Sequence, residues 1–219
     1  MFTYSNLAWY TYPMLLPIVY RIKALRTPVR SLLYLYFIFG FTSVLTSTFV
    51  QIAIFKMFSD IQTNILSGML MFTGIMVGFC FFGYVISHYR LDAKQGFYYS
   101  FISFTLGLLL LSQVTTVTVA YIAMFIYGLG NGFFWLTIHT YELTETRDEE
   151  RDFYSSVLSS GGKLISIIAP LCATGILWLS VSFFHTSSFG LLFMITPLLY
   201  LLGLFFLEEY KPIAPNELQ

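Results

Sequence analysis

Charged residues are scarce in this chain. Asp, Glu, Lys and Arg make up 10% of its 219 residues, whereas 57% are hydrophobic and 20% are aromatic. A soluble domain carries about a quarter charged residues. The 11 basic and 11 acidic side chains balance, so no excess of positive charge is present to neutralise nucleic-acid phosphates. The composition therefore argues against an ordinary water-soluble domain and against nucleic-acid binding.

Cysteine and histidine are also sparse. Cys80 and Cys172 lie inside apolar stretches, where we expect reduced, inert thiols that behave as small hydrophobes. His88, His139 and His185 are scattered rather than spaced as metal ligands. The sequence has no Gly-x-x-x-x-Gly-Lys-Ser/Thr loop and no His-Glu-x-x-His motif. We therefore expect neither an enzyme nor a bound cofactor or metal.

Long apolar runs separate the few charge clusters. Runs of about 20 residues match the thickness of a hydrocarbon core, so each is interpreted as a spanning helix. The sequence predicts an all-α membrane protein, with a six-helix transmembrane domain over residues 31–208 and a cytoplasmic tail over 209–219. The predicted helices are 31–57, 64–88, 96–113, 117–141, 153–181 and 189–207.

Residues 1–30 differ from the rest. The apolar stretch 7–20 is short and contains Pro13 and Pro17, which favours an amphipathic, interfacial helix over a seventh span. The alternative, a seven-helix carrier in which this stretch crosses the membrane, stays open. A basic run follows directly, formed by Arg21, Lys23, Arg26 and Arg30.

Lys and Arg in short loops predict the orientation. The basic run, the pair Arg90 and Lys94, and the pair Arg147 and Arg151 all fall on one side of a six-helix topology. Because cytoplasmic loops carry the excess of positive charge, we expect both termini in the cytoplasm. We expect the protein to lie in a plasma membrane or an inner membrane.

Small residues recur at helical spacing within the apolar runs. Gly74 and Gly78 are four residues apart, as are Gly128 and Gly132. Such pairs allow close approach of membrane helices, and we expect them to mark packing faces. The same is expected of the small residues of the fifth predicted helix, Ser156, Ser160 and Ala169.

Three segments resemble the amino-terminal half of a major facilitator superfamily transporter. They are GYVISHYRLDAK, the run YGLGNGFFWLTIHTYELTETRDEERDFYSS, and SSGGKLISIIAPLCATG, and a sixth helix ending in LEEYKP completes the likeness. Gly83 matches the Gly of that family's Gly-xxx-Asp-Arg signature, whereas Ser87 and His88 stand at its Asp and Arg positions. The Arg that opens a fourth-helix motif in many proton-coupled members is missing.

The resemblance implies a secondary transporter that moves a small solute by alternating access. Family members that act alone have two six-helix halves with the substrate site between them, whereas this chain corresponds to one half, a bundle of the 3+3 repeat type. We therefore expect a homodimer or a separate second six-helix half. The alternatives are a fragment of a twelve-helix transporter and a non-transporting membrane scaffold or assembly protein.

Polar side chains within the apolar runs are candidate substrate or coupling residues. An ammonium inside a helix, Lys163, needs a partner or a water-filled cavity, unless it snorkels to the interface. His139 and Glu142 share a helix face and could relay a proton, or form an ordinary solvated pair. Gln51 and Asn131 could line a polar path or serve as interhelical glue.

A cytoplasmic gate is a further expectation from the resemblance. The acidic and basic residues near 145–152 could close that side by pairing with the basic turn near 90–94, or they could form a solvated loop. The gate candidates are Gly83, Arg90, Lys94, Glu145, Arg147 and Arg151.

Overall fold

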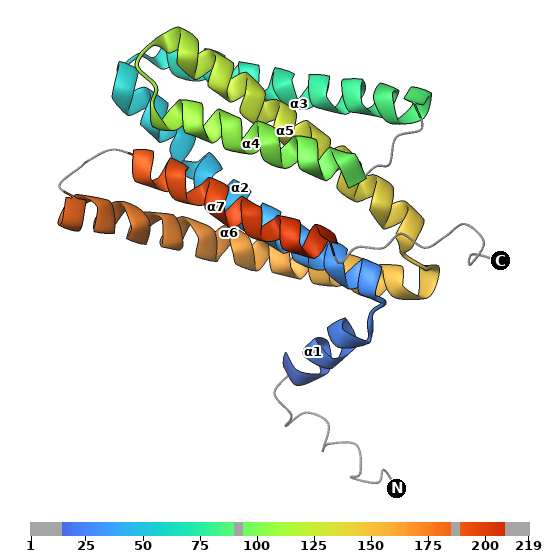
Figure 1. Ribbon diagram of the computed structural model, residues 1–219. Coiled ribbons are helices and arrows are strands. Elements are labelled where there is room, and N and C mark those ends of the chain that lie inside the picture. The colour runs from blue at the N-terminus through green and yellow to red at the C-terminus, as the bar shows by residue number, and fades with distance from the viewer. Residues whose placement is uncertain (1–14, 90–93, 185–188, 209–219) are drawn as a thin grey trace, which may run out of the picture.

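The computed structural model describes residues 15–89, 94–184 and 189–208, and each element in these ranges is a helix (Figure 1). All six predicted spans are present, and each is long and apolar enough to cross a membrane. The chain is therefore a multi-pass membrane protein. The helices are α1 (Leu15–Ala24), α2 (Thr27–Phe58), α3 (Ile61–Tyr89), α4 (Lys94–Ser112), α5 (Val117–Glu145), α6 (Asp148–Phe184) and α7 (Gly190–Glu208).

The charged segment between α5 and α6 is shorter than the sequence suggested. The prediction of a loop across 142–152 is wrong, because α5 continues to Glu145 and α6 begins at Asp148. Acidic residues in the first turn of α6 favour this early start, since they lie at the positive end of the helix dipole. Charge excludes a residue from the hydrocarbon core but not from a helix that projects beyond it. The arrangement leaves Thr146 and Arg147 as a tight corner.

The six long helices pack as two groups of three. In Figure 1, α3, α4 and α5 lie together on one side of the bundle and α2, α6 and α7 on the other. In chain order the six helices form two sets, α2–α4 and α5–α7. The first helix of each set packs with the other set, because α2 packs on α6 and α7 while α5 packs on α3 and α4. The contacts of α2 with α6 and α7 thus mirror those of α5 with α3 and α4, as expected of a 3+3 repeat in which α2–α4 correspond to α5–α7.

The glycine pairs mark packing faces, as the sequence predicted, and they join α3 to α5. A Cβ on Gly78 would lie 2.8 Å from the Leu129 carbonyl oxygen and 3.1 Å from the Gly132 Cα. Gly74 and Gly128 face each other in the same way. The two backbones are in contact, which is how small residues hold membrane helices together where lipid removes the hydrophobic drive.

The contact of α6 with the rest of the chain is narrower. Ala169 and Ala173 are buried in the core, whereas Ser156 and Ser160 are exposed. The expectation that these two serines mark a packing face within the chain is therefore wrong. Their spacing of four residues puts them on one side of α6, but that side faces away from α2.

Candidate functional site: a polar face on three helices

The exposed side of α6 is divided by chemistry. Leu164, Ile168 and Leu171 form an apolar surface, as contact with lipid requires. A polar stripe lies on another side of the same helix, at spacings of three and four residues that keep its members on one face. These exposed residues, called here the α6 stripe, are Ser155, Ser159, Lys163 and Ser166.

A second polar row runs along α2. Tyr36, Gly40, Ser43 and Ser47 recur at intervals of four, three and four residues, so they share one face of the helix. Tyr36, Gly40 and Ser43 are half-buried and Ser47 is exposed. This α2 row lies on the side that turns toward α5 and α6, because its first three members line a pocket shared with those helices.

Helix α5 contributes an aromatic, an imidazole and a carboxylate in one row. The Trp135 ring stacks on the His139 ring at 5.6 Å between centroids, and His139 Nδ1 lies 3.2 Å from Glu142 Oε2. Tyr36 of α2 meets Trp135 edge to face at 5.9 Å. The His139 side chain is 57% exposed, whereas that of Glu142 is 20% exposed. The imidazole thus lies at the surface of the chain, with the half-buried carboxylate beside it.

A pocket of about 140 Å³ lies where the α2 row meets Trp135 of α5 and Gly162 of α6. Its walls come from α2, α5 and α6, through the Tyr36 and Trp135 rings, Gly40, Ser43 and Gly162. A Cβ on Gly162 would lie 3.6 Å from the Tyr36 hydroxyl, so the glycine leaves room beside that oxygen. The pocket is thus lined by aromatic residues, glycines and one serine.

Lys163 follows Gly162 but does not line this pocket. Its side chain is exposed and forms no ion pair with any residue that the structure describes. At 1.5 Å per residue it lies roughly 22 Å along α6 from Asp148, although the charged first turn of the helix projects beyond the hydrocarbon core. An exposed cation at this depth needs water or a counter-charge from outside the chain.

Asn131 and Gln51 lie apart from the pocket. Asn131 is 7% exposed, and its Nδ2 donates to the Tyr127 carbonyl one turn earlier. The Tyr127 hydroxyl in turn lies 3.1 Å from Thr46 Oγ1, which joins α5 to α2 inside the core. Gln51 is half-buried, and its Nε2 would be 3.5 Å from a Cβ on Gly68 of α3. Gln51 therefore lies at a contact between α2 and α3, whereas the hydrogen bond described for Asn131 stays within α5.

The gate candidates are split between several places. Arg90 lies outside the described residues, Lys94 begins α4, and Gly83 packs α3 near Leu136 of α5. Glu145 is 6% exposed at the end of α5, whereas Arg147 is exposed in the corner.

The corner between α5 and α6 is held by two arginines. Arg26, just before α2, reaches Glu150 through Nε at 3.1 Å and Nη2 at 3.0 Å, and also donates to the Glu145 carbonyl. Arg151 donates to Asp148 at 2.9 Å and to the Thr146 carbonyl at 3.1 Å. Both arginines thus bind groups of this same corner, Arg26 from the start of α2 and Arg151 from within α6.

Sequence reasoning placed Arg26 only in the basic run and missed its structural partner. The partner lies 124 residues away in the chain, and no periodicity connects the two. The α2 row and the α6 stripe were also missed as rows, although their spacing was readable once the buried faces of α2 and α6 were known.

The comparisons with known proteins identify the fold. No family model matches the sequence, and no curated protein matches it by sequence. Two crystal structures of the peptide transporter POT in complex with sulfate match instead. One has a TM-score of 0.61 and covers 87% of this chain, and the E310Q mutant has a TM-score of 0.60 and covers 86%. Both are 16% identical to this chain.

The chain spans 41% of the length of each of these transporters. At 16% identity the likeness shows the fold alone. Together with the six apolar helices and their exchanged packing, it shows that this chain has the fold of one half of a major-facilitator-type transporter.

Proposed function

We propose that this protein is one half of a secondary membrane transporter, which moves a small solute when its polar face meets a second six-helix unit. The observation that carries the proposal is the α6 stripe, with an ammonium exposed far along a helix that crosses the membrane. Lipid contact would leave the Lys163 ammonium and the Ser155 and Ser159 hydroxyls unsatisfied, whereas the Ser166 hydroxyl already donates to the Lys163 carbonyl at 2.7 Å. A water-filled cavity between two units would satisfy them.

Two further rows support the proposal, the α2 row and the row of Trp135, His139 and Glu142 on α5. They converge with α6 at the pocket beside Tyr36 and Trp135, and transporters of this fold bind substrate between their halves. Lys163 would attract an anionic group of the solute, and His139 with Glu142 would supply a proton-exchanging pair. The second unit would be another copy of this chain or a separate six-helix protein.

The gate of this transporter would lie at the end that carries the arginine-bound corner. There Arg147 is exposed and could pair with acidic groups of the second unit, while Arg26 and Arg151 hold the corner in place. By the positive-inside rule, the basic run at this end would put the gate in the cytoplasm, with both termini on that side.

Cysteine accessibility tests whether the face is wetted. In a background with Cys80→Ala and Cys172→Ala, Ser43→Cys and Ser166→Cys would be exposed to a membrane-impermeant thiol reagent in native membrane vesicles. We expect both to react, because a water-filled cavity lets the thiol ionise. Leu164→Cys, on the apolar side of the same helix, is the matched control and should stay unreacted.

The opposite pattern would contradict the proposal. If Ser166→Cys is as inert as Leu164→Cys under conditions where an introduced loop cysteine reacts, the α6 stripe is not wetted. A dry α6 stripe that crosslinks to an unrelated membrane protein would favour the alternative, a scaffold that keeps the fold without transport.

A further inference from the structure

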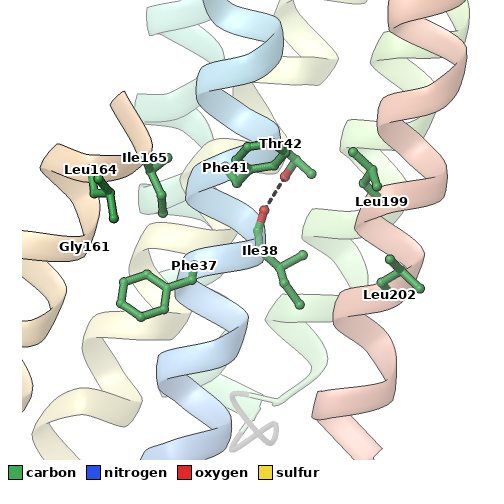
Figure 2. Close-up of a pocket in the computed structure, with 9 residues that line it drawn as sticks. All are labelled: Phe37, Ile38, Phe41, Thr42, Gly161, Leu164, Ile165, Leu199 and Leu202. Carbon is green, nitrogen blue, oxygen red and sulfur yellow. Dashed lines mark hydrogen bonds between the residues drawn. The ribbon is translucent and has the colours of Figure 1, made fainter. Parts of the chain in front are cut away.

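The outward side of α2 carries a groove with no polar surface. Helices α6 and α7 form its two walls and α2 its floor, and the cavity measures about 410 Å³ (Figure 2). Figure 2 shows the Phe37 ring lying toward Gly161 and Leu164, with Leu199 and Leu202 on the opposite wall. The one hydroxyl in the lining, that of Thr42, donates to the Ile38 carbonyl at 2.8 Å. The groove therefore offers only apolar contact.

The dimensions of the groove fit a hydrocarbon chain better than a helix. A helix is about 10 Å across, so 410 Å³ would hold only about one turn of it. The floor residues from Phe37 to Thr42 extend over several ångströms along α2, roughly 10 to 18 Å beyond Arg30 at 1.5 Å per residue. One leaflet of the hydrocarbon core is about 15 Å thick. An acyl chain whose headgroup lies near Arg30 would reach the groove.

The groove lies in line with the basic run. Arg30, Tyr34, Phe37 and Phe41 recur at intervals of four, three and four residues, which places them on one face of α2. Arg30 Nη1 donates to the Lys23 carbonyl at 3.4 Å, and this bond brings the end of α1 to that face. The basic side chains thus stand at the membrane-surface end of the groove.

Most of this positive charge has no counter-charge among the described residues. Arg26 is bound to Glu150, whereas Arg21, Lys23 and Arg30 form no ion pair with a described carboxylate. Arg21 instead lies over the Phe153 ring of α6 at 5.9 Å. Three cations at the mouth of an apolar groove match an anionic headgroup joined to an acyl chain.

A small apolar cluster fixes these cations relative to the groove. Leu25, Val29 and Leu33 pack against Tyr154 and Leu158 of α6. Phe37 also packs against this cluster and lines the groove. The headgroup end and the chain end are therefore parts of one packed unit rather than separate surfaces.

We propose that the groove and the basic run together form a binding site for an anionic glycerophospholipid. The phosphate lies among Arg21, Lys23 and Arg30, and one acyl chain lies between α6 and α7 against Phe37 and Leu202. The site belongs to the leaflet at the basic end of the bundle. It does not depend on transport or on a second unit, because its walls come from this chain alone.

A photocrosslinking experiment tests both ends of the site. The full chain in phosphatidylcholine nanodiscs would be labelled with phosphatidylglycerol, or with phosphatidylcholine, carrying a photoreactive group on one acyl chain. We expect the phosphatidylglycerol probe to label the peptides that contain 37–42, 161–165 or 199–202 more strongly than the phosphatidylcholine probe. This comparison uses the unaltered protein, so it does not depend on any variant folding.

Two variants separate the headgroup from the chain. Each cation near an anionic surface contributes enough to change affinity about fivefold, so Arg30→Gln should lower phosphatidylglycerol labelling by about that factor. Leu202→Trp should abolish labelling of the groove by filling it. Leu106→Trp, which fills a second apolar groove between α4 and α7, is the matched control and should leave the labelling unchanged.

Equal labelling by the two probes, together with no effect of Arg30→Gln, would overturn the proposal, since any lipid would then fill the groove. Undiminished labelling of the groove in Leu202→Trp would overturn it too. So would labelling that falls only on peptides outside the groove.

Discussion

The two groups of three helices differ in how closely they pack. In the group of α3, α4 and α5, backbones touch through Gly74, Gly78, Gly128 and Gly132. In the group of α2, α6 and α7, the walls α6 and α7 stand apart over a groove, and α6 is exposed along most of its length. The correspondence between the two groups therefore does not extend to how closely their helices pack.

The difference in packing indicates which helices can shift relative to their neighbours. The glycine contacts leave no room for adjustment, because a backbone cannot rotate away as a side chain can. The contact of α6 with α2 uses flexible side chains such as Phe37, which lies against Gly161. We expect the group of α3, α4 and α5 to be the rigid part of the bundle and α6 its more adjustable element.

Gly128→Leu should break the tighter group. A side chain at this position would collide with the Met71 carbonyl group and with Gly74, so we expect destabilisation at or above ~3 kcal/mol, the upper end for over-packed cores. Folded protein should be largely lost, as measured by size-exclusion chromatography after heating in detergent. Gly175→Leu is the control on α6, where no atom lies within 4 Å of an added Cβ. Equal recovery of both variants would contradict the contrast between the groups.

Arg26→Gln should loosen the corner that joins the two groups. The change leaves Glu150 without its described ion pair and removes a donor from the Glu145 carbonyl. Hydrogen bonds to charged groups contribute about 1.5–3 kcal/mol, and the partial exposure of this pair, 22% and 20%, puts the expected loss at the lower end. A double-mutant cycle with Glu150→Gln measures the coupling, and additive effects would show that the pair contributes nothing.

Tyr127→Phe should weaken the link between α2 and α5. It removes the hydroxyl that lies 3.1 Å from Thr46 Oγ1, and such bonds in membrane bundles are worth about 0.6 kcal/mol on average. Tyr154→Phe is the control, because the buried Tyr154 hydroxyl has no hydrogen-bond partner among the described residues. Its removal should be neutral or stabilising. Thermal unfolding in lipid discs compares the two variants, and an equal loss in both would contradict the assignment.

The smallest expected effect lies at the start of α3. Asp60 accepts from the Thr63 hydroxyl at 2.6 Å and from the backbone N–H groups of Thr63 and Gln62, and these bonds lower the pKa of the Asp60 carboxyl. Because the folded pKa is the lower one, the stabilisation is present above the unfolded value of about 3.9. It is lost as pH falls through the folded pKa.

Unfolding measured between about pH 6 and pH 3 tests this cap. The wild-type protein should lose slightly more stability over that range than Asp60→Asn, which cannot titrate there. Identical pH profiles would show that the cap contributes no pH dependence.

Length and hydropathy were sufficient to predict the six spans, because the bilayer imposes them on each helix separately. The glycine pairs were predictable because their four-residue spacing can be recognised within each helix separately. The exchange of α2 and α5 between the groups could not be derived from these local patterns, since it depends on contacts between distant segments, and only the resemblance to a 3+3 repeat pointed to it. The proximity of His139 and Glu142 followed from their spacing, whereas Arg26 meets Glu150 only through the tertiary fold.

The exposure of individual polar residues could be determined only from the structure. Ser156 and Ser160 of α6 were expected to mark a packing face together with Ala169, and these two serines instead face outward. Spacing tells which residues share a face, but not whether that face meets another helix, lipid or water. Lys163 is the residue where this matters most, because an ammonium needs water or a counter-charge.

The most direct test of a two-unit transporter is the oligomeric state in membrane lipid, measured by native mass spectrometry of protein expressed at low level from its own locus. The account predicts a homodimer, or a complex with a second six-helix chain, that is disrupted by Ser159→Trp on the α6 stripe and not by Leu171→Trp on the apolar side. A protein that is strictly monomeric in native lipid would contradict it.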